Sequence, residues 1–310
     1  MHTRLRDGAE FDLVRRFLDV WGDDAAGIGD DAAVLPAVKN ARLVATIDSS
    51  VENVHFRRDW LTPAEIGYRA AAAALSDLAA MAASPLGILT AIVLPETWLA
   101  DADQIANGIA EAASGCDAKV LGGDLSGGGE LAITISALGA AQRPLLRSGA
   151  RIGDFIYVTG RLGGPAAAVR AFRSGASPQG KHRGRFAHPI PRLREAIWLA
   201  QSGISAGIDI SDGLVADLEH VAAASDVSIS VDLEHVPAID GVSQLDAAGS
   251  GEEYELAVTS GSELDTKEFE RRFGIELTRI GMVEKGAARV TLLDRGTRVA
   301  SPSGYLHFSK

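Results

Sequence analysis

The sequence predicts a mixed α/β protein of two domains, each built from one sheet backed by helices. With 310 residues the chain is long for a single hydrophobic core, so two domains of roughly 150 residues each are expected. Apolar segments with helical spacing alternate with short β-branched segments along both halves, which favours helices packed on a sheet in each half. We place the boundary before Arg147, which gives predicted domains of 1–146 and 147–310.

The composition is that of an ordinary soluble globular protein, with 46% hydrophobic and 23% charged residues. A net charge of −11 argues against a sequence-independent nucleic-acid surface, because a phosphate backbone needs a basic protein face. No apolar run reaches the ~20 residues of a membrane-spanning helix, and the first residues lack the apolar core of a signal peptide, so we expect a cytoplasmic protein. The single cysteine, Cys116, excludes an internal disulfide and is expected to be a small buried side chain.

In the first half, the helix expected from Thr62 onward is the most distinctive element. Pro63 stands at its first turn, where proline is tolerated. The alanine run 70–74 indicates very close packing against a neighbour, and Asp77 interrupts the apolar face. The other expected elements are helices at 10–21 and 100–114, and strands at 42–48, 87–94, 118–121 and 131–138, of which the strands at 42–48 and 87–94 are expected to be buried.

A second cycle of strands and helices begins after the predicted boundary. The segment 174–188 is rich in Gly, Ser, Pro, Lys and Arg, which predicts a mobile loop. Asp209, Ser211 and Asp212 stand around the end of a strand, and Asp217 lies one turn on in the following helix. The other expected elements are strands at 155–159 and 227–233, helices at 165–172 and 192–201, and a turn at 250–255 that leads into another strand.

Seven aspartates stand beside small residues or at expected strand ends: Asp30, Asp31, Asp48, Asp77, Asp124, Asp209 and Asp212. Any one of them could cap a helix or stabilise a turn, but the whole set is harder to explain in that way. Gly122 and Gly123, expected to follow a short strand, would leave backbone amides free for close approach to a phosphate. Clustered carboxylates usually meet phosphates through Mg²⁺, and phosphoryl transfer needs such charge neutralisation more than covalent chemistry.

Three other candidates each have a structural alternative. His55 is either a packed polar residue or a ligand-binding residue. Arg147 is either a surface charge or a cation that faces nucleotide phosphates. Tyr305 either packs the C-terminal tail or provides an aromatic platform for a ligand ring.

Eight short motifs follow one another in a fixed order along nearly the whole chain. They lie at 29–33, 48–56, 75–81, 122–124, 147–150, 210–214, 250–256 and 304–308. In this order and spacing they resemble the thiamine-monophosphate kinases, within the family that includes aminoimidazole ribonucleotide synthetase. The resemblance implies a synthetase-like fold of two α/β domains, in which the N-terminal domain dimerises and helps to bind ATP and the C-terminal domain closes over it.

The resemblance also implies an activity and a set of site residues. The activity is phosphorylation of thiamine monophosphate to thiamine diphosphate by ATP, through direct in-line transfer with several Mg²⁺ and without a phosphoenzyme. No covalent or general-base residue is implied. The implied Mg²⁺ ligands are Asp30, Thr46, Asp48, Asp77, Asp124, Asp209 and Asp212. The implied ATP contacts are Gly122, Gly123, Arg147 and Ser211, and the implied thiamine monophosphate contacts are His55, Glu252 and Tyr305.

Two alternatives remain open at this stage. The family usually has Gly-Gly-Asp-Thr-Thr-Arg-Gly where this chain has Gly-Gly-Asp-Leu-Ser-Gly-Gly at 122–128, which lacks a hydroxyl and a cation near the phosphates. A nucleotide-binding relative with altered catalysis is therefore one alternative. The other is a different ATP-dependent synthetase of the same superfamily. Two such synthetases need a reactive cysteine, near the N-terminus or at the C-terminus, and Cys116 is in neither place.

Overall fold

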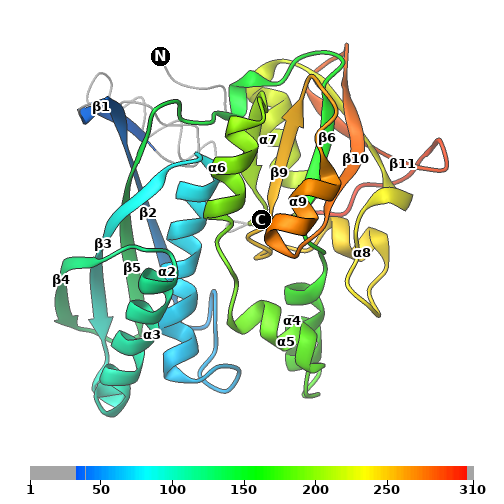
Figure 1. Cartoon of the computed structure of the whole chain (residues 1–310). Helices are drawn as coiled ribbons and strands as arrows, with labels where there is room; N and C mark the ends of the chain where they lie inside the picture. Colours follow the sequence, from blue (N-terminus) through cyan, green and yellow to red (C-terminus); the bar gives the residue numbers. More distant parts are fainter. Residues whose placement is uncertain (1–32, 39, 306–310) are drawn as a thin grey trace.

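The fold was analysed in a computed structural model, which describes residues 33–38 and 40–305. The helix expected at 10–21, and Asp30 and Asp31 with the turn around them, lie outside the described residues. The described chain forms two sheets with helices between and around them, in agreement with the predicted fold class (Figure 1). The boundary at residues 146 and 147 stays a prediction.

The first sheet has five strands in the order β1-β2-β5-β3-β4, and only the β3–β4 pair is parallel. Its strands are β1 (Ala33–Val38), β2 (Ala41–Val51), β3 (Ser84–Leu94), β4 (Val120–Gly127) and β5 (Ala132–Ala141). Two helices, α2 (Pro63–Ala80) and α3 (Ala102–Gly115), cover one face of this sheet, and a 3₁₀ turn at Glu96–Asp101 leads into α3 (Figure 1).

The predicted close packing of α2 is confirmed, and glycines explain how it is possible. A Cβ atom on Gly67 of α2 would lie 2.1 Å from the carbonyl oxygen of Ile105, and one on Gly108 of α3 would lie 1.9 Å from that of Ala64. The two backbones therefore touch where they cross, which only glycine permits. The predicted start of α2 is also confirmed, because Thr62 forms a reciprocal capping box with Glu65.

The second sheet has seven strands in the order β12-β11-β8-β10-β6-β9-β7, antiparallel except for β8–β11. Its strands are β6 (Phe155–Thr159), β7 (Ala206–Asp209), β8 (Ser228–Asp232), β9 (Leu256–Ser260), β10 (Leu277–Glu284), β11 (Arg289–Asp294) and β12 (Thr297–Arg298). The helices are α4 (Gly164–Arg173), α5 (Gly180–Ala187), α6 (Leu193–Gln201), α7 (Leu214–Ser225), α8 (Gln244–Ala248) and α9 (Thr266–Phe273), and 3₁₀ turns lie at Arg147–Gly149 and Leu233–His235.

Helix α2 joins the two halves of the molecule, and Figure 1 shows it between the two sheets. Glu65 accepts two hydrogen bonds from the Arg183 guanidinium of α5, at 2.7 and 2.8 Å. Further along α2, Ser76 donates to a carboxylate oxygen of Asp209 at the end of β7, at 2.5 Å. These contacts align one face of α2 with the edge at which β7 ends.

The prediction of a mobile loop at 174–188 is wrong for its second part, because residues Gly180–Ala187 form α5, whereas residues 174–179 belong to no helix or strand. Glycines at 180 and 184 conceal the helical pattern in the sequence, since glycine is a poor helix former. Tertiary contacts stabilise this helix instead: Phe186 is fully buried, and the His182 ring lies 3.0 Å from the carbonyl oxygen of Asp240. Arg183 adds the ion pair with Glu65.

Three expected strand properties also differ in the structure. Strand β2 continues past Asp48 to Val51, so Asp48 lies inside the strand. Strands β2 and β3 are only partly buried, because the helices cover one face of their sheet. The residues expected to form a phosphate-binding turn, 122–124, lie within β4 at the edge of the sheet, where every residue is exposed.

Candidate active site

A cavity of about 640 Å³ receives side chains from both halves of the chain. Its walls come from β2 and the turn after it, α2, α4, the loop after β7, and the segments around 249–254 and 303–305. Eight of the residues predicted from the sequence line it: Asp48, His55, Asp77, Asp209, Ser211, Asp212, Glu252 and Tyr305.

The register of the first sheet explains why β2 contributes to this cavity. Thr46 and Asp48 pair with Ala137 and Ile135 of β5, both of which are completely buried on the face covered by α2. Paired residues of neighbouring strands share a face, so Thr46 and Asp48 also face α2. There the Thr46 hydroxyl donates to a carboxylate oxygen of Asp77 at 2.5 Å. Thr46 does not line the cavity itself and contacts it through Asp77.

The second half of the chain places two more carboxylates beside Asp48 and Asp77 in the cavity. Asp209 is buried at the end of β7 and accepts the hydrogen bond from Ser76, the residue before Asp77. Asp212 follows in the loop that leads into α7. The acidic wall is therefore made of Asp48, Asp77, Asp209 and Asp212, two from each half of the chain.

The chemistry of these donors fits a hard divalent cation. All four acidic groups offer oxygen atoms, as does the Thr46 hydroxyl beside Asp77. Mg²⁺ prefers carboxylate and water oxygens and usually binds through one or two carboxylates together with substrate phosphates. Four like charges around one cavity repel each other unless cations or protons offset them. The acidic wall can thus hold a metal ion that also meets an anionic substrate.

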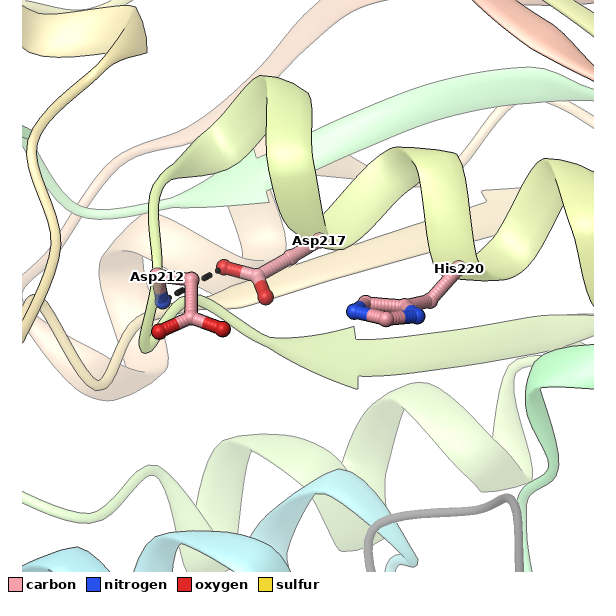
Figure 2. A group of neighbouring side chains, drawn as sticks. All are labelled: Asp212, Asp217 and His220. Atoms are coloured by element: carbon pink, nitrogen blue, oxygen red, sulfur yellow. Dashed lines mark hydrogen bonds between the residues drawn. The ribbon is translucent and has the colours of Figure 1, made fainter. Parts of the chain in front are cut away.

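A second group of titratable side chains lies behind this wall. Figure 2 shows Asp217 facing Asp212, with His220 further along α7, and ligand atoms of the three lie within 4.8 Å of one another. Burial raises the pKa of Asp217 well above its ordinary value, and the charges of Asp212 and Asp209 raise it further. The N–H of Gly213 and the positive charge of Arg147 act in the opposite direction, which places Arg147 near this group although it does not line the cavity.

The predicted substrate contacts lie on other walls. The Nδ1 atom of His55 accepts the backbone N–H of Val51 at 3.0 Å, so the neutral ring carries its proton on Nε2. Glu252 has a left-handed backbone with φ of 58°, and its carboxylate accepts a hydrogen bond from Arg69 of α2 at 2.6 Å. The backbone N–H of Tyr305 donates to the carbonyl of Asp212 at 3.1 Å, which holds the C-terminal segment against the cavity.

Sequence reasoning missed the aromatic and cationic end of the cavity. Trp60 lines this end and stacks on Phe172 of α4, with ring centroids 5.3 Å apart. Three arginines line the cavity near it: Arg57, Arg170 and Arg173. Trp60 lies just before the Thr62–Pro63 helix start, but nothing in the sequence relates it to α4, so no local signal identifies it.

The structure does not bring Gly122, Gly123 and Asp124 into the cavity. Asp124 pairs with Ala91 of β3, which in turn pairs with Thr134 of β5, and this row lies on the sheet face turned away from α2. The aspartates of the acidic wall lie on the side that α2 covers. The role predicted for Asp124 therefore stays a prediction, and no contact with the acidic wall supports it.

Cys116 behaves as expected for a small apolar side chain. It is partly buried and packs against the core that surrounds α2 and α3. Burial raises the pKa of its thiol to about 12, so the reactive thiolate form is suppressed.

Glu253, a buried carboxyl next to Glu252, predicts a pH dependence of stability. The N–H of Gly163 donates to it at 2.5 Å, and a guanidinium nitrogen of Arg185 lies 3.4 Å from its other oxygen. Burial raises its pKa from the ordinary value of 4.5 to about 7, although Arg185 acts in the opposite direction.

Between these two pKa values the folded protein binds more protons at Glu253 than the unfolded chain does. The stabilising contribution of protonated Glu253 is therefore complete below about pH 4.5 and is lost as the pH rises through about 7. Glu253→Gln keeps an acceptor for Gly163 and removes this titration. We expect the difference in Tm, wild type minus variant, to decrease as the pH is raised from about 5 to about 8. A difference that is constant over this range would contradict the assignment.

Comparisons with known proteins show similarity over nearly the whole chain. Residues 29–141 match the family model of the AIR synthase related protein, N-terminal domain, and residues 151–292 match that of its C-terminal domain. A thiamine-monophosphate kinase of Buchnera aphidicola subsp. Acyrthosiphon pisum is 32% identical over 96% of this chain and 98% of its own. That of Escherichia coli (strain K12) is 33% identical over 97% and 98%.

The structural comparison agrees with the sequence comparisons. AaThiL complexed with AMPPCP and TMP has a TM-score of 0.85 and 29% identity, over 96% of this chain and 97% of that one. The structural similarity therefore extends over nearly the whole chain. Within the residues that the structure describes, no helix is long and apolar enough to cross a membrane.

Proposed function

We infer that this chain, which belongs to the thiamine-monophosphate kinases of the AIR synthase related family, transfers the terminal phosphoryl group of ATP to thiamine monophosphate. The product is thiamine diphosphate. The observation that carries this inference is the acidic wall, to which each half of the chain contributes two aspartates around one cavity. The similarity to AaThiL in complex with the ATP analogue AMPPCP and with TMP supports the same reaction for this cavity.

We propose that Mg²⁺ accompanies the nucleotide at the acidic wall. The residues that would hold it are Thr46, Asp48, Asp77, Asp209 and Asp212, joined by Asp30 and Asp124 in the family assignment. When bound, Mg²⁺ neutralises the charge of the phosphates and lets two anionic substrates approach each other. The chain's own contribution is to fix its carboxylates: Thr46 orients Asp77, and Ser76 orients Asp209.

The reaction itself needs little covalent chemistry from the protein. An oxygen of the thiamine monophosphate phosphate forms a bond with the terminal phosphorus of ATP, while the bond from that phosphorus to the bridging oxygen breaks and ADP leaves. The attacking oxygen is already anionic near neutral pH, because the second pKa of a phosphate ester is about 6. No proton must be removed from it, so positioning and charge neutralisation carry the catalysis.

The proposed reaction also assigns roles to residues outside the acidic wall. His55 can donate from Nε2, and Glu252 offers a negative charge to the positively charged thiazolium ring of the substrate. Tyr305 provides an aromatic surface on the cavity wall, as does Trp60, which the sequence did not predict. Ser211 lines the cavity beside Asp212, and its assignment to ATP is part of this proposal. Arg147 does not line the cavity, so its assignment to ATP rests on the family resemblance alone.

The direct test is to incubate the purified protein with ATP, Mg²⁺ and thiamine monophosphate and to separate the products by chromatography. Free thiamine serves as the control acceptor. Thiamine diphosphate formed from the monophosphate alone supports the proposal. Bound ATP without product would instead favour a nucleotide-binding relative with altered catalysis, the reading that the unusual 122–128 segment motivates.

We also propose that the protein forms a homodimer through the open face of its first sheet. Ile47 of β2 and Leu89 of β3 both pair with Ser136 of β5, so all three lie in one row on the face turned away from α2. Ile47 is 67% exposed and Leu89 is 41% exposed. Exposed apolar rows on a sheet are typical of interfaces between subunits.

Leu89→Asp places a charge in this row and is expected to shift the protein from dimer to monomer in sedimentation analysis. The physical reason is that an uncompensated carboxylate cannot be buried between two apolar surfaces at low cost. Leu245→Asp is a matched control, because Leu245 of α8 has a similar exposure of 43% and lies elsewhere on the surface. A dimer that survives Leu89→Asp would contradict this interface.

A further inference from the structure

The loop between β7 and α7 carries Ser211 and Asp212 into the cavity, yet it lacks an ordinary helix cap. The N-cap position of α7 is Gly213, which has no side chain and a φ of 127°. A Cβ at this position would also lie 3.2 Å from the backbone of Gly249. The backbone N–H groups before the helix must therefore find an acceptor from another residue.

Asp217, one turn into α7, provides that acceptor. A single carboxylate oxygen of Asp217 accepts the backbone N–H groups of Ser211, Asp212 and Gly213, at 3.0, 3.1 and 3.0 Å. The backbone N–H of Asp217 donates in return to the carbonyl of Gly213 at 2.9 Å. The side chain is only 2% exposed, so water does not compete for these hydrogen bonds.

The opposite side of the same loop is held by other parts of the cavity wall. The N–H of Glu252 donates to the carbonyl of Ser211 at 2.6 Å, and the N–H of Tyr305 donates to the carbonyl of Asp212 at 3.1 Å. With Asp217 in place, both the N–H and the carbonyl groups of this loop are fixed. The backbone that carries Ser211 and Asp212 therefore has little freedom to move, and Figure 2 shows the hydrogen bond between Asp217 and the backbone of Asp212.

We propose that Asp217 is a positioning residue, which fixes the Ser211–Gly213 loop so that Asp212 is preorganised for the metal and Ser211 for the nucleotide. This role rests on the proposed function of the cavity. An Asp side chain suits it because one of its oxygens lies 3.0–3.1 Å from all three backbone nitrogens. Residues that orient metal ligands typically contribute about 10- to 100-fold to activity or metal affinity, without contact to the metal.

Two substitutions at Asp217 separate positioning from other roles. Asp217→Ala removes the acceptor, whereas Asp217→Asn keeps an oxygen of the same shape. For Asp217→Ala we expect about 10- to 100-fold lower kcat and a higher Mg²⁺ concentration for half-maximal activity. Hydrogen exchange at the amides of 211–213 should also be at least about tenfold faster, because these amides lose their acceptor. Asp217→Asn should remain close to the wild type in kcat, in the Mg²⁺ concentration for half-maximal activity and in amide exchange at 211–213.

Asp154→Ala is the matched control. Asp154 is also buried, also accepts a backbone N–H, that of Arg151 at 3.0 Å, and does not line the cavity. This variant should have a lower Tm and unchanged exchange at 211–213. A merely structural role for Asp217 predicts that Asp217→Ala behaves in the same way.

Three results would overturn the proposal. The first is unchanged amide exchange at 211–213 in folded Asp217→Ala, and the second is a kcat within about threefold of the wild type. The third is a calorimetric Mg²⁺ affinity as low in Asp217→Asn as in Asp217→Ala, which would make Asp217 a metal ligand together with Asp212 and His220. If Asp217→Ala does not fold, Asp217→Asn carries the comparison with the wild type. If the wild type makes no thiamine diphosphate, the proposed function fails, while the exchange measurement still tests the positioning role.

Discussion

Replacing Asp77 by Asn is expected to lower kcat about 100- to 1000-fold and, at the same time, to raise the Tm of the metal-free protein. Asp77 lies on α2 among alanines and faces the cavity together with three other aspartates. Removal of one negative charge reduces their mutual repulsion, which stabilises the fold when no cation is bound. The same removal takes away a proposed ligand of the cation that neutralises the phosphates.

The two effects can be measured separately. Thiamine diphosphate formation gives kcat, and thermal unfolding in the presence of a chelator gives the Tm of the metal-free protein. Thermal unfolding with excess Mg²⁺ then shows how much the metal stabilises each protein. Asp103→Asn is the control, because Asp103 is exposed on α3 and does not line the cavity. It should leave kcat and the stabilisation by Mg²⁺ unchanged.

The opposite pattern would assign Asp77 a structural role. In that case Asp77→Asn would lower the Tm in chelator, because Asp77 would serve mainly as the acceptor for Thr46. The loss of activity would then follow the loss of folded protein, and Mg²⁺ would still stabilise the variant as much as the wild type.

The elements that the sequence predicts correctly have local signals. The start of α2 combines Thr62, Pro63 and Glu65, and each residue acts on its own turn. Strand β5 alternates between buried and half-buried residues, and this alternation is already visible in the sequence. Such elements are found because the information that defines them lies within a few residues.

Helix α5 and the continuation of β4 beyond residue 121 could not be predicted in this way, because their contacts come from distant residues. Arg183 of α5 is held by Glu65, which lies 118 residues away in the chain. The glycines at 122 and 123 indicate a turn, but pairing with β3 extends them into a strand. Tertiary pairing overrides local preference in both cases.

The acidic side of the cavity was predictable, and the aromatic side was not. Aspartates beside small residues are rare enough to be singled out, and four of them line one cavity in the structure. Trp60 and Arg69 have no such signal, because a tryptophan or an arginine before or within a helix is equally common without a functional role. Arg69 can be related to Glu252 only after the two halves of the chain are folded together.

The position of the acidic wall also depends on the crossing of α2 and α3. A substitution at this crossing is therefore expected to have a large effect on stability. Gly108→Ala is expected to lower the free energy of unfolding by about 3 kcal/mol or more, because overpacking of a well-packed site typically costs about 1–3 kcal/mol and here the contact is with backbone. The new Cβ would lie 1.9 Å from the carbonyl oxygen of Ala64 and 2.8 Å from the backbone nitrogen of Tyr68. Backbone cannot rotate away as a flexible side chain can, so the two helices must separate.

Gly115→Ala, at the C-terminal end of the same helix, is the matched control. No atom lies within 4 Å of a Cβ at Gly115, so this substitution should be neutral or should stabilise α3 by up to about 1 kcal/mol. Urea unfolding of both variants measures the difference. Because α2 carries Asp77 and Ser76, the folded fraction of Gly108→Ala should also bind Mg²⁺ more weakly than Gly115→Ala does. Equal stability of the two variants would mean that α2 and α3 can separate without cost, and the glycines would then not determine where α2 places its aspartate.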